Sequence, residues 1–402
     1  MLDIWPALPI SIYSVEDDSS LMKGADNIIA ALEHNDRVCQ IVLPDLSSRR
    51  LESFTPAMQE PFPVLMNLMI GSSDETIPVI PDSFLGGFAP HLRYLHLHSI
   101  QFPALPKLLL SATDLVDLHL WRVPHSGSGY ISPEAMATCM SALTRLEVFS
   151  LDFLFPPSVP DPIDRRPPLP TRTLLPALTE LSFQGASEYL DDLVSRIDAP
   201  LLYYINLTFY NQPNFDTTQL VRFLSHTKRL SAFNRANLMI SQLDGDIVFF
   251  PQSGPPDSLR VVLSLSFYEQ EWQLSSLARF YSSFLSPLSA LEPIFLEVNA
   301  HRSSDDMEDP TQWLELLHPF IAVKNLYLDA KVVPRVARAL QELVGERVTE
   351  VLPSLQNIFL KPQQPKSSRP IPQVIPAAIE QFAAERQLAG HPVAVHDGEE
   401  SG

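Results

Sequence analysis

The chain repeats one arrangement of hydrophobic positions along most of its length. An apolar residue is followed by two other residues, a second apolar residue, one further residue and a third apolar residue, as at Leu92, Leu95 and Leu97 in HLRYLHL. Full matches begin at Val38, Leu65, Leu92, Leu115, Leu146, Leu178, Leu202, Leu291, Val323 and Leu355. Two degraded matches begin at Leu230 and Arg260, so that successive starts are separated by 23 to 32 residues.

Segments with the hydrophobic spacing of amphipathic helices separate these stretches. Ser132 and Pro133, for example, provide an N-cap and a first-turn proline before AMATCMSAL. Other helices are predicted at 26–33, 188–197, 217–226, 274–285, 311–320 and 334–344. Strand and helix alternating with a period of about 29 residues is typical of leucine-rich repeats. The pattern therefore predicts an α/β fold, an irregular leucine-rich-repeat solenoid with a curved parallel sheet and helices on its convex face.

The repeat also suggests how the chain is divided. We expect, in order along the sequence, an N-terminal lead-in segment (1–25), the solenoid (26–360) with a proline-rich loop insertion (156–173), a linker (361–376), a C-terminal capping helix (377–390) and a tail (391–402). The proline-rich segment is also compatible with a polyproline ligand for a partner domain. An insertion loop on one face of the solenoid is the favoured interpretation.

Alternation along the predicted strands assigns one set of side chains to the open face of the sheet. Leu95 and Leu97 point into the core, so the residues between and beside them point outward. The predicted binding surface consists of Tyr94, His96, His98, Asp117, His119 and Trp121. Because neighbouring strands lie about 4.8 Å apart, His96 and His119 are expected side by side. The alternative for these residues is a solvated sheet face partly covered by loops.

Two histidines close to Asp117 raise the possibility of a metal site. Zinc requires three or four ligands in a tetrahedral arrangement, which columns of side chains on a flat sheet supply poorly. We therefore predict a polar and aromatic surface that binds protein, with no metal and no cofactor.

Composition and charge exclude several partners and compartments. The chain has 28 Lys and Arg against 47 Asp and Glu, a formal net charge of −19. Nucleic acids and anionic membrane surfaces, which require clustered basic residues, are not expected partners. No apolar run approaches the roughly 18 residues of a membrane span, and the N-terminus is a poor signal peptide. With only Cys39 and Cys139, we expect a reducing compartment, either the cytoplasm or the nucleus.

The motifs that usually mark catalysis are missing from the sequence. Neither phosphate-binding nor dinucleotide-binding glycine loops occur, nor do the H-E-x-x-H zinc motif and the G-x-S-x-G nucleophile elbow. We therefore predict that the protein is not an enzyme and has no catalytic residues. An enzyme with an unfamiliar, non-sequential site is the remaining catalytic hypothesis.

Several longer segments carry a family resemblance. They are LDIWPALPI (2–10), DNIIAALEHNDRV (26–38), PHLRYLHLHSIQFPALPKLLLSATDLVDLHL (90–120), YISPEAMATCMSALTRLEVFSLDF (130–153), LLPALTELSFQGASEYLDDLVSRIDAPLL (174–202), FYNQPNFDTTQLVRFL (209–224), WQLSSLARF (272–280) and FAAERQLAGHPV (382–393). As a set, these segments resemble the leucine-rich-repeat region of fungal F-box proteins, especially those of mushroom-forming fungi. The resemblance spans nearly the whole chain.

The resemblance implies the substrate-recognition part of an F-box-type ubiquitin-ligase receptor. In that family an N-terminal F-box docks on the ligase adaptor and the repeats hold the target protein. Here the segment that usually follows the F-box comes directly after Met1, so the adaptor is an expected partner only if an F-box exists upstream. The alternative is a free-standing leucine-rich-repeat scaffold with no link to ubiquitin ligase.

Overall fold

The computed structural model describes residues 8–14, 25–125, 127, 129–154, 172–210, 215, 217–227, 233–241, 244–251, 260–266, 274–285, 293–300, 309–361 and 376–397. The chain forms two compact units, unit 1 at Met1–Leu202 and unit 2 at Tyr203–Gly402. Most of the predicted proline-rich loop and nearly all of the predicted linker lie outside the described residues. The predicted solenoid, 26–360, spans parts of both units.

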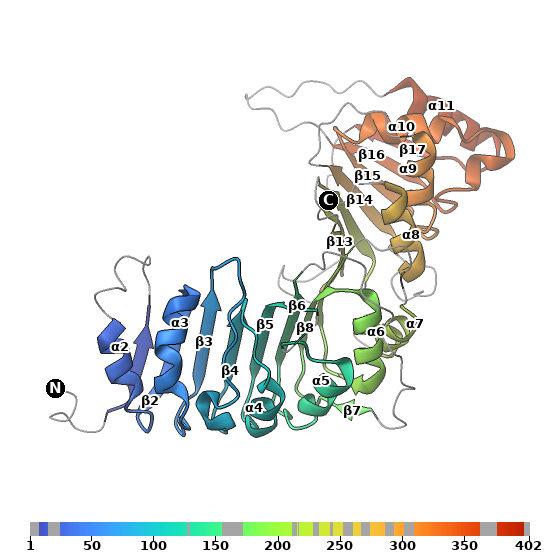
Figure 1. The fold of residues 1–402 in the computed structure, drawn as a ribbon. Helices are drawn as coiled ribbons and strands as arrows, with labels where there is room; N and C mark the ends of the chain where they lie inside the picture. Colours follow the sequence, from blue (N-terminus) through green and yellow to red (C-terminus); the bar gives the residue numbers. More distant parts are fainter. Residues whose placement is uncertain are drawn as a thin grey trace. The chain divides into compact units, whose positions relative to one another are not determined.

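Unit 1 is built on a parallel sheet whose strands follow one another in sequence order (Figure 1). Its strands are β1 (Ile10–Tyr13), β2 (Val38–Leu46), β3 (Asn67–Ser72), β4 (Tyr94–His98), β5 (Asp117–Val123), β6 (Val148–Phe153) and β8 (Glu180–Gly185). Two short strands, β7 (Thr173–Leu174) and β9 (Ile197–Asp198), form a separate parallel pair. The predicted α/β class with parallel repeat strands is confirmed.

The strands of unit 1 are held in register by two rows of buried apolar side chains. One row contains Ile41, Leu68, Leu95, Leu118, Phe149 and Leu181, each the register partner of the next. The second row contains Leu43, Ile70, Leu97, Leu120, Leu151 and Phe183. All twelve side chains are at most 4% exposed. Burying one such side chain contributes about 1.5–3 kcal/mol, so the rows fix which residues face the opposite side.

Helices lie along one face of this sheet in Figure 1. They are α2 (Ala25–Leu32), α3 (Ser48–Phe54), α4 (Leu105–Ser111), α5 (Pro133–Met140) and α6 (Ser187–Arg196), with short 3-10 turns at Thr55–Met58 and Phe84–Gly87. The predicted N-cap is confirmed, because Ser132 Oγ accepts a hydrogen bond from the Ala135 backbone N–H at 3.2 Å. Helices α3 and α4 were not among the helices predicted from the sequence.

Unit 2 has a second set of strands in which the sequence order is broken. The strands are β10 (Tyr204–Tyr210), β11 (Arg235–Ile240), β12 (Asp244–Phe250), β13 (Arg260–Ser266), β14 (Phe295–Ala300), β15 (Asn325–Asp329), β16 (Asn357–Lys361) and β17 (Ala394–Asp397). Their order in the sheet is β10-β13-β12-β11-β14-β15-β16-β17. Strand β12 runs antiparallel to both of its neighbours, and the other pairings are parallel. Helices α7 (Thr218–His226), α8 (Leu274–Leu285), α9 (Pro310–Leu317) and α10 (Val333–Gln341) connect strands of this unit.

This reversal corrects the sequence prediction for the two degraded matches. Strand β11 begins at Arg235 rather than at Leu230, and β12 was not predicted. Only three residues separate β11 from β12, a connection that permits antiparallel pairing alone. The chain turns back once more after β12, so β13 lies beside β10 while β11 pairs with β14. The sequence DGDIVFF does not follow the template of three apolar residues at fixed spacing, although alternate residues of this strand are buried in the structure.

Both predicted terminal segments contribute a strand. The lead-in segment contains β1, which pairs with β2, and the tail contains β17, which pairs with β16. The predicted C-terminal helix is present as α11 (Ala377–Leu388), with Ile379 and Phe382 buried. Together, α11 and β17 form one further helix–strand unit rather than a helix followed by a structureless tail.

Arg386, on α11, forms hydrogen bonds with the segment that precedes β16. Its side chain is completely buried. Its guanidinium donates hydrogen bonds to the carbonyl oxygens of Val348, Pro353 and Leu355 at 3.1–3.2 Å. Charged hydrogen bonds of this kind satisfy backbone carbonyls that the loop itself leaves without partners.

We predict that Arg386→Met lowers the free energy of unfolding of unit 2 by about 2–4 kcal/mol, because three backbone carbonyls, two of them in buried hydrogen bonds, lose their donor. Denaturant unfolding followed by circular dichroism measures the change. Arg338→Met, at an exposed position on α10, is the matched control and should change stability little. Equal effects of the two substitutions would contradict this role for Arg386.

Candidate functional site

The predicted surface residues come together on the open face of β4 and β5. The register pairs Tyr94 with Asp117, His96 with His119, and His98 with Trp121. The predicted neighbour relationship of the two histidines is therefore confirmed, with their ring centroids 4.4 Å apart. We call the six residues Tyr94, His96, His98, Asp117, His119 and Trp121 the β4–β5 surface.

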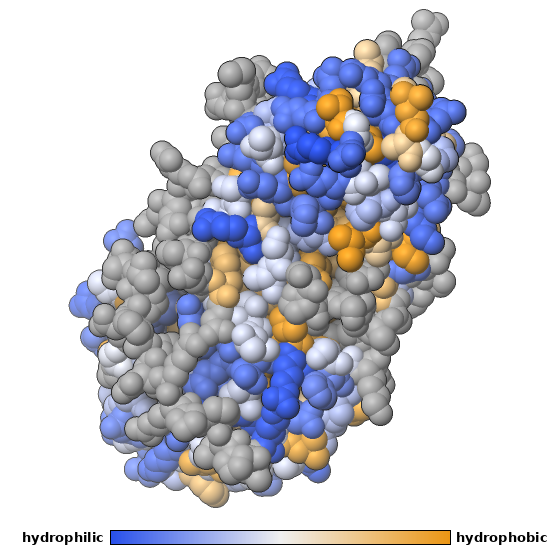
Figure 2. All heavy atoms as spheres, turned by 90° about the vertical axis from the view of Figure 1, so that its right-hand side faces the viewer, coloured by the Kyte–Doolittle hydropathy of each residue, from blue (hydrophilic) through white to orange (hydrophobic). Residues whose placement is uncertain are grey.

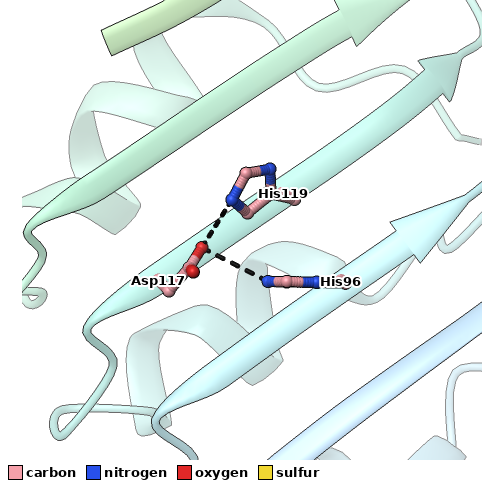
Figure 3. Close-up of side chains that lie close together, drawn as sticks. All are labelled: His96, Asp117 and His119. Carbon is pink, nitrogen blue, oxygen red and sulfur yellow. Dashed lines mark ion pairs between the residues drawn. The ribbon is translucent and has the colours of Figure 1, made fainter. Parts of the chain in front are cut away.

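Asp117 lies beside the two histidines and contacts both of them (Figure 3). Its Oδ1 atom is 2.8 Å from His119 Nε2 and 3.3 Å from His96 Nε2. The three side chains are each about one-fifth exposed. Their ligand atoms lie within 4.8 Å of one another, so this is the group of described residues that could hold a metal ion.

The two imidazoles determine the charge state of Asp117. Burial by itself would raise the pKa of this carboxyl, but the contacts with His119 and His96 outweigh burial and lower the pKa to about 2. The carboxylate is therefore ionised throughout the physiological range of pH. It provides a fixed negative charge beside the two imidazole rings.

Aromatic rings flank the polar centre. Tyr94 is 39% exposed and Trp121 is 40% exposed, both high for large aromatic side chains. The Trp121 ring lies 5.2 Å from His119 and 6.1 Å from His98, in edge-to-face arrangements. Trp121 Nε1 donates a hydrogen bond to Ser150 Oγ at 3.3 Å, which fixes one edge of the indole. Much of the ring remains available for contact.

A β-bulge follows Trp121. The register between β5 and β6 shifts between Leu120 and Val123. Arg122 has a φ of 54°, in the left-handed region that residues other than glycine seldom adopt. Such bulges redirect side chains beside functional surfaces. Burial, together with the charge of Arg122, lowers the pKa of His98 although Asp45 acts in the opposite direction, which favours the neutral imidazole.

Asp152 is a second acidic residue on the open face of unit 1, in β6. Burial raises its pKa to about 6, although the charge and the backbone of Arg122 act to lower it. Its Oδ1 atom is buried without a hydrogen-bond partner. Asp117 and Asp152 therefore have pKa values shifted in opposite directions by their surroundings.

Unit 2 has an aromatic row on its own open face that the sequence analysis did not single out. Tyr327, Phe359 and His396 stack on adjacent strands, with ring centroids 4.5 and 4.7 Å apart. Beside them, Lys361 Nζ forms an ion pair with Glu297 Oε1 at 2.8 Å. Alternation about Leu326 and Leu328 would have indicated Tyr327, whereas His396 could not be found because β17 had been assigned to a tail.

Two surface hollows lie away from the β4–β5 surface. A hollow of about 540 Å³ near the starts of β2, β3 and β4 is lined by Val64, Met66 and Arg93, among others. A hollow of about 680 Å³ in unit 2 lies among α8, α9 and the segment around Arg347. Neither Asp117 nor Asp152 lines either hollow. Asp117 and Asp152, whose pKa values are shifted in opposite directions, therefore lie outside these two hollows.

Among the residues coloured in Figure 2, hydrophilic side chains predominate on the face shown, and hydrophobic ones occur in small separate groups. Within the described ranges, no helix combines the length and the apolar character needed to cross a membrane.

Comparisons with known proteins do not assign the chain to a family. No protein-family model matches the chain, and neither does any curated protein. The leucine-rich repeat-containing protein LegL7 from Legionella pneumophila is similar in structure over 94% of this chain and 97% of its own, at 11% identity and a TM-score of 0.29. An internalin (inlF) from Listeria monocytogenes is similar over 92% and 93%, at 14% identity and a TM-score of 0.26. These values are too low to transfer a function, so the function must be inferred from the geometry of the chain itself.

We predict that the stabilising effect of Asp117 disappears in acid. A carboxyl whose pKa is lowered on folding stabilises the folded state above its unfolded pKa and loses that effect as pH falls through the folded value. Between wild type and Asp117→Asn, the difference in unfolding free energy should be on the order of 2 kcal/mol near pH 5 and should shrink towards zero near pH 2. Denaturant unfolding at each pH measures it, with Asp36→Asn at an exposed position correcting for the loss of one charge. A difference independent of pH would contradict the prediction.

Asp152→Asn should have the opposite effect. Because the folded pKa of Asp152 is raised, ionisation of its carboxyl costs stability as pH rises from about 4 to 6. The substitution should stabilise the protein at pH 7 by on the order of 2 kcal/mol and have little effect at pH 4. Thermal unfolding at the two pH values tests this prediction. If Asp152→Asn is less stable than wild type at pH 7, the carboxylate of Asp152 has more favourable contacts than we infer and the prediction is wrong.

Proposed function

We propose that the protein is a non-catalytic binding protein whose β4–β5 surface contacts a protein partner. The observation that carries the proposal is the pair of exposed aromatic rings, Tyr94 and Trp121, on either side of a charged centre on a sheet of buried leucines. Tyrosine and tryptophan supply large contact areas with few rotatable bonds, and they are enriched among residues that dominate binding energy.

The form of the surface favours a polypeptide ligand over a small substrate. The side chains of the β4–β5 surface stand on adjacent strands of an open sheet, outside both surface hollows. Small molecules usually bind in concave pockets that bury most of their surface. An extended row of polar and aromatic side chains is better matched to the area and the mixed chemistry of another protein.

We further propose that this binding serves target recognition in an F-box-type ubiquitin-ligase receptor, acting in the cytoplasm or nucleus. The support for this narrower role is the sequence resemblance to the repeat region of fungal F-box proteins. In such a receptor the repeats would hold the target, and an F-box upstream of Met1 would dock on the ligase adaptor. The net charge of −19 favours targets with basic surfaces.

The binding proposal predicts that Trp121→Ala and Tyr94→Ala each weaken binding of the protein's own partner by at least about tenfold, because anchor residues contribute about 2 kcal/mol or more. Partners are identified by affinity purification from the native organism, and their affinities for purified variants are measured by calorimetry. Leu110→Ala is the matched control, since this residue is 49% exposed on α4. If the partners bind Trp121→Ala and Tyr94→Ala as tightly as they bind wild type and Leu110→Ala, the β4–β5 surface is not the binding site.

The ubiquitin-ligase role has a separate test. Sequencing the 5′ end of the native transcript shows whether an F-box is encoded in frame with Met1. An in-frame F-box, and copurification of the adaptor with the longer product, would support the role. A stop codon directly upstream of Met1 would contradict it and leave a free-standing scaffold that binds through the same surface.

A further inference from the structure

We propose that His96, Asp117 and His119 form a binding site for one divalent transition-metal ion of the Zn²⁺ type, with the remaining coordination positions open to water. The site lies entirely within unit 1. It is independent of the proposed protein-binding function, because it requires no partner.

The spacing of the ligand atoms is that of a coordination shell. Zinc binds imidazole nitrogen and carboxylate oxygen at about 2.0–2.2 Å, so neighbouring ligand atoms in a tetrahedral shell lie about 3.4 Å apart. Asp117 Oδ1 is 2.8 Å from His119 Nε2 and 3.3 Å from His96 Nε2. The three atoms all fall within 4.8 Å of one another. An ion placed among them would therefore reach all three with small adjustments of the side chains.

The contacts are close without being well-aligned hydrogen bonds. His96 Nε2 and Asp117 Oδ1 are buried atoms that have no hydrogen-bond partner of good geometry, despite the short distances between them. A hydrogen bond requires the oxygen to lie near the axis of the ring N–H. When an imidazole and a carboxylate share a metal, the ion occupies that axis and the oxygen lies well to its side. His96 Nε2 and Asp117 Oδ1 lie 3.3 Å apart and do not meet the geometry of a hydrogen bond.

The ligand chemistry selects the class of ion. Two imidazoles and one carboxylate are a ligand set found in catalytic zinc sites and in sites for other first-row transition metals. Calcium and magnesium favour shells made of oxygen and are poorly matched by two histidines.

The sheet presents these ligands as a triangle rather than a column. Asp117 and His119 are separated by two positions on β5, and His96 is the register partner of His119 on β4. The three side chains therefore converge from two strands towards the carboxylate, as Figure 3 shows. The sequence argued against a metal site because side chains on a flat sheet supply tetrahedral ligands poorly. The convergence of these three side chains from two strands meets that argument.

The affinity for the metal ion depends on the hydrogen bonds that the histidines make with their second ring nitrogens. Histidine ligands usually donate their second ring N–H to a carboxylate or carbonyl, and loss of that outer contact weakens binding about 10–100-fold. His119 Nδ1 is buried without such a partner. We therefore expect one ion per chain, bound more weakly than in a closed four-ligand structural site.

The test uses the full chain, freed of any affinity tag and treated with a chelator. Calorimetry with Zn²⁺ measures stoichiometry and affinity, and the visible absorption of Co²⁺ in the same site reports its coordination geometry. We expect one site per chain, weakened at least about 10–100-fold in His96→Ala, His119→Ala and Asp117→Asn, because each removes an inner ligand. His91→Ala is the matched control. It removes an exposed histidine that lies 3.3 Å from the carboxylate of Asp114, outside the β4–β5 surface, and it should keep the wild-type affinity.

Thermal unfolding of each variant without metal establishes that it folds, and His119→Gln replaces His119→Ala if the smaller side chain prevents folding. Zn²⁺ should raise the unfolding temperature of wild type and of His91→Ala in a saturable manner, and it should not do so for the ligand variants. Absence of Zn²⁺ binding to wild type would overturn the proposal. Equal binding by wild type and the ligand variants would do the same.

Discussion

The structure of unit 1 depends on the register of its buried apolar rows. Each strand contributes two apolar side chains to the interior, and each is the direct partner of its counterparts on the neighbouring strands. Because side chains alternate along a strand, a slip of one residue would expose both rows and bury the polar set. The cost of that exposure fixes the register. The same register brings His96 beside His119 and Tyr94 beside Asp117, so the core determines the composition of the open face.

The sequence predicted this part of the molecule well because one short pattern encodes both faces of each strand. The spacing around Leu95 and Leu118 sufficed to place His96, His119 and Trp121 on one surface. It could not predict the reversal of β11, β12 and β13, because strand order in a sheet depends on the lengths of the connections and not on the apolar pattern within a strand. Strand β17 was missed for a related reason. AVHD has little strand character alone and is recruited by pairing with β16.

The pattern indicated on which face of the sheet each residue lies. It did not indicate the local environment of that residue. The sequence placed two histidines near Asp117, but it did not indicate that burial raises the pKa of Asp152 while the two imidazoles lower that of Asp117. The bulge at Arg122 was equally hidden, since a positive φ at an arginine has no sequence signal. These differences arise from contacts across strands. They decide whether three neighbouring polar residues remain a solvated row or converge as a group able to bind an ion.

The most direct test of the central claim is cysteine scanning across β5. In a background with Cys39 and Cys139 replaced, single cysteines at 117 through 121 are treated with a thiol-reactive probe in the folded protein. The β4–β5 register predicts rapid labelling at 117, 119 and 121 and protection at 118 and 120 until the protein is unfolded. Labelling that is uniform along the strand, or that alternates in the opposite phase, would contradict the claim that the buried rows set the open face.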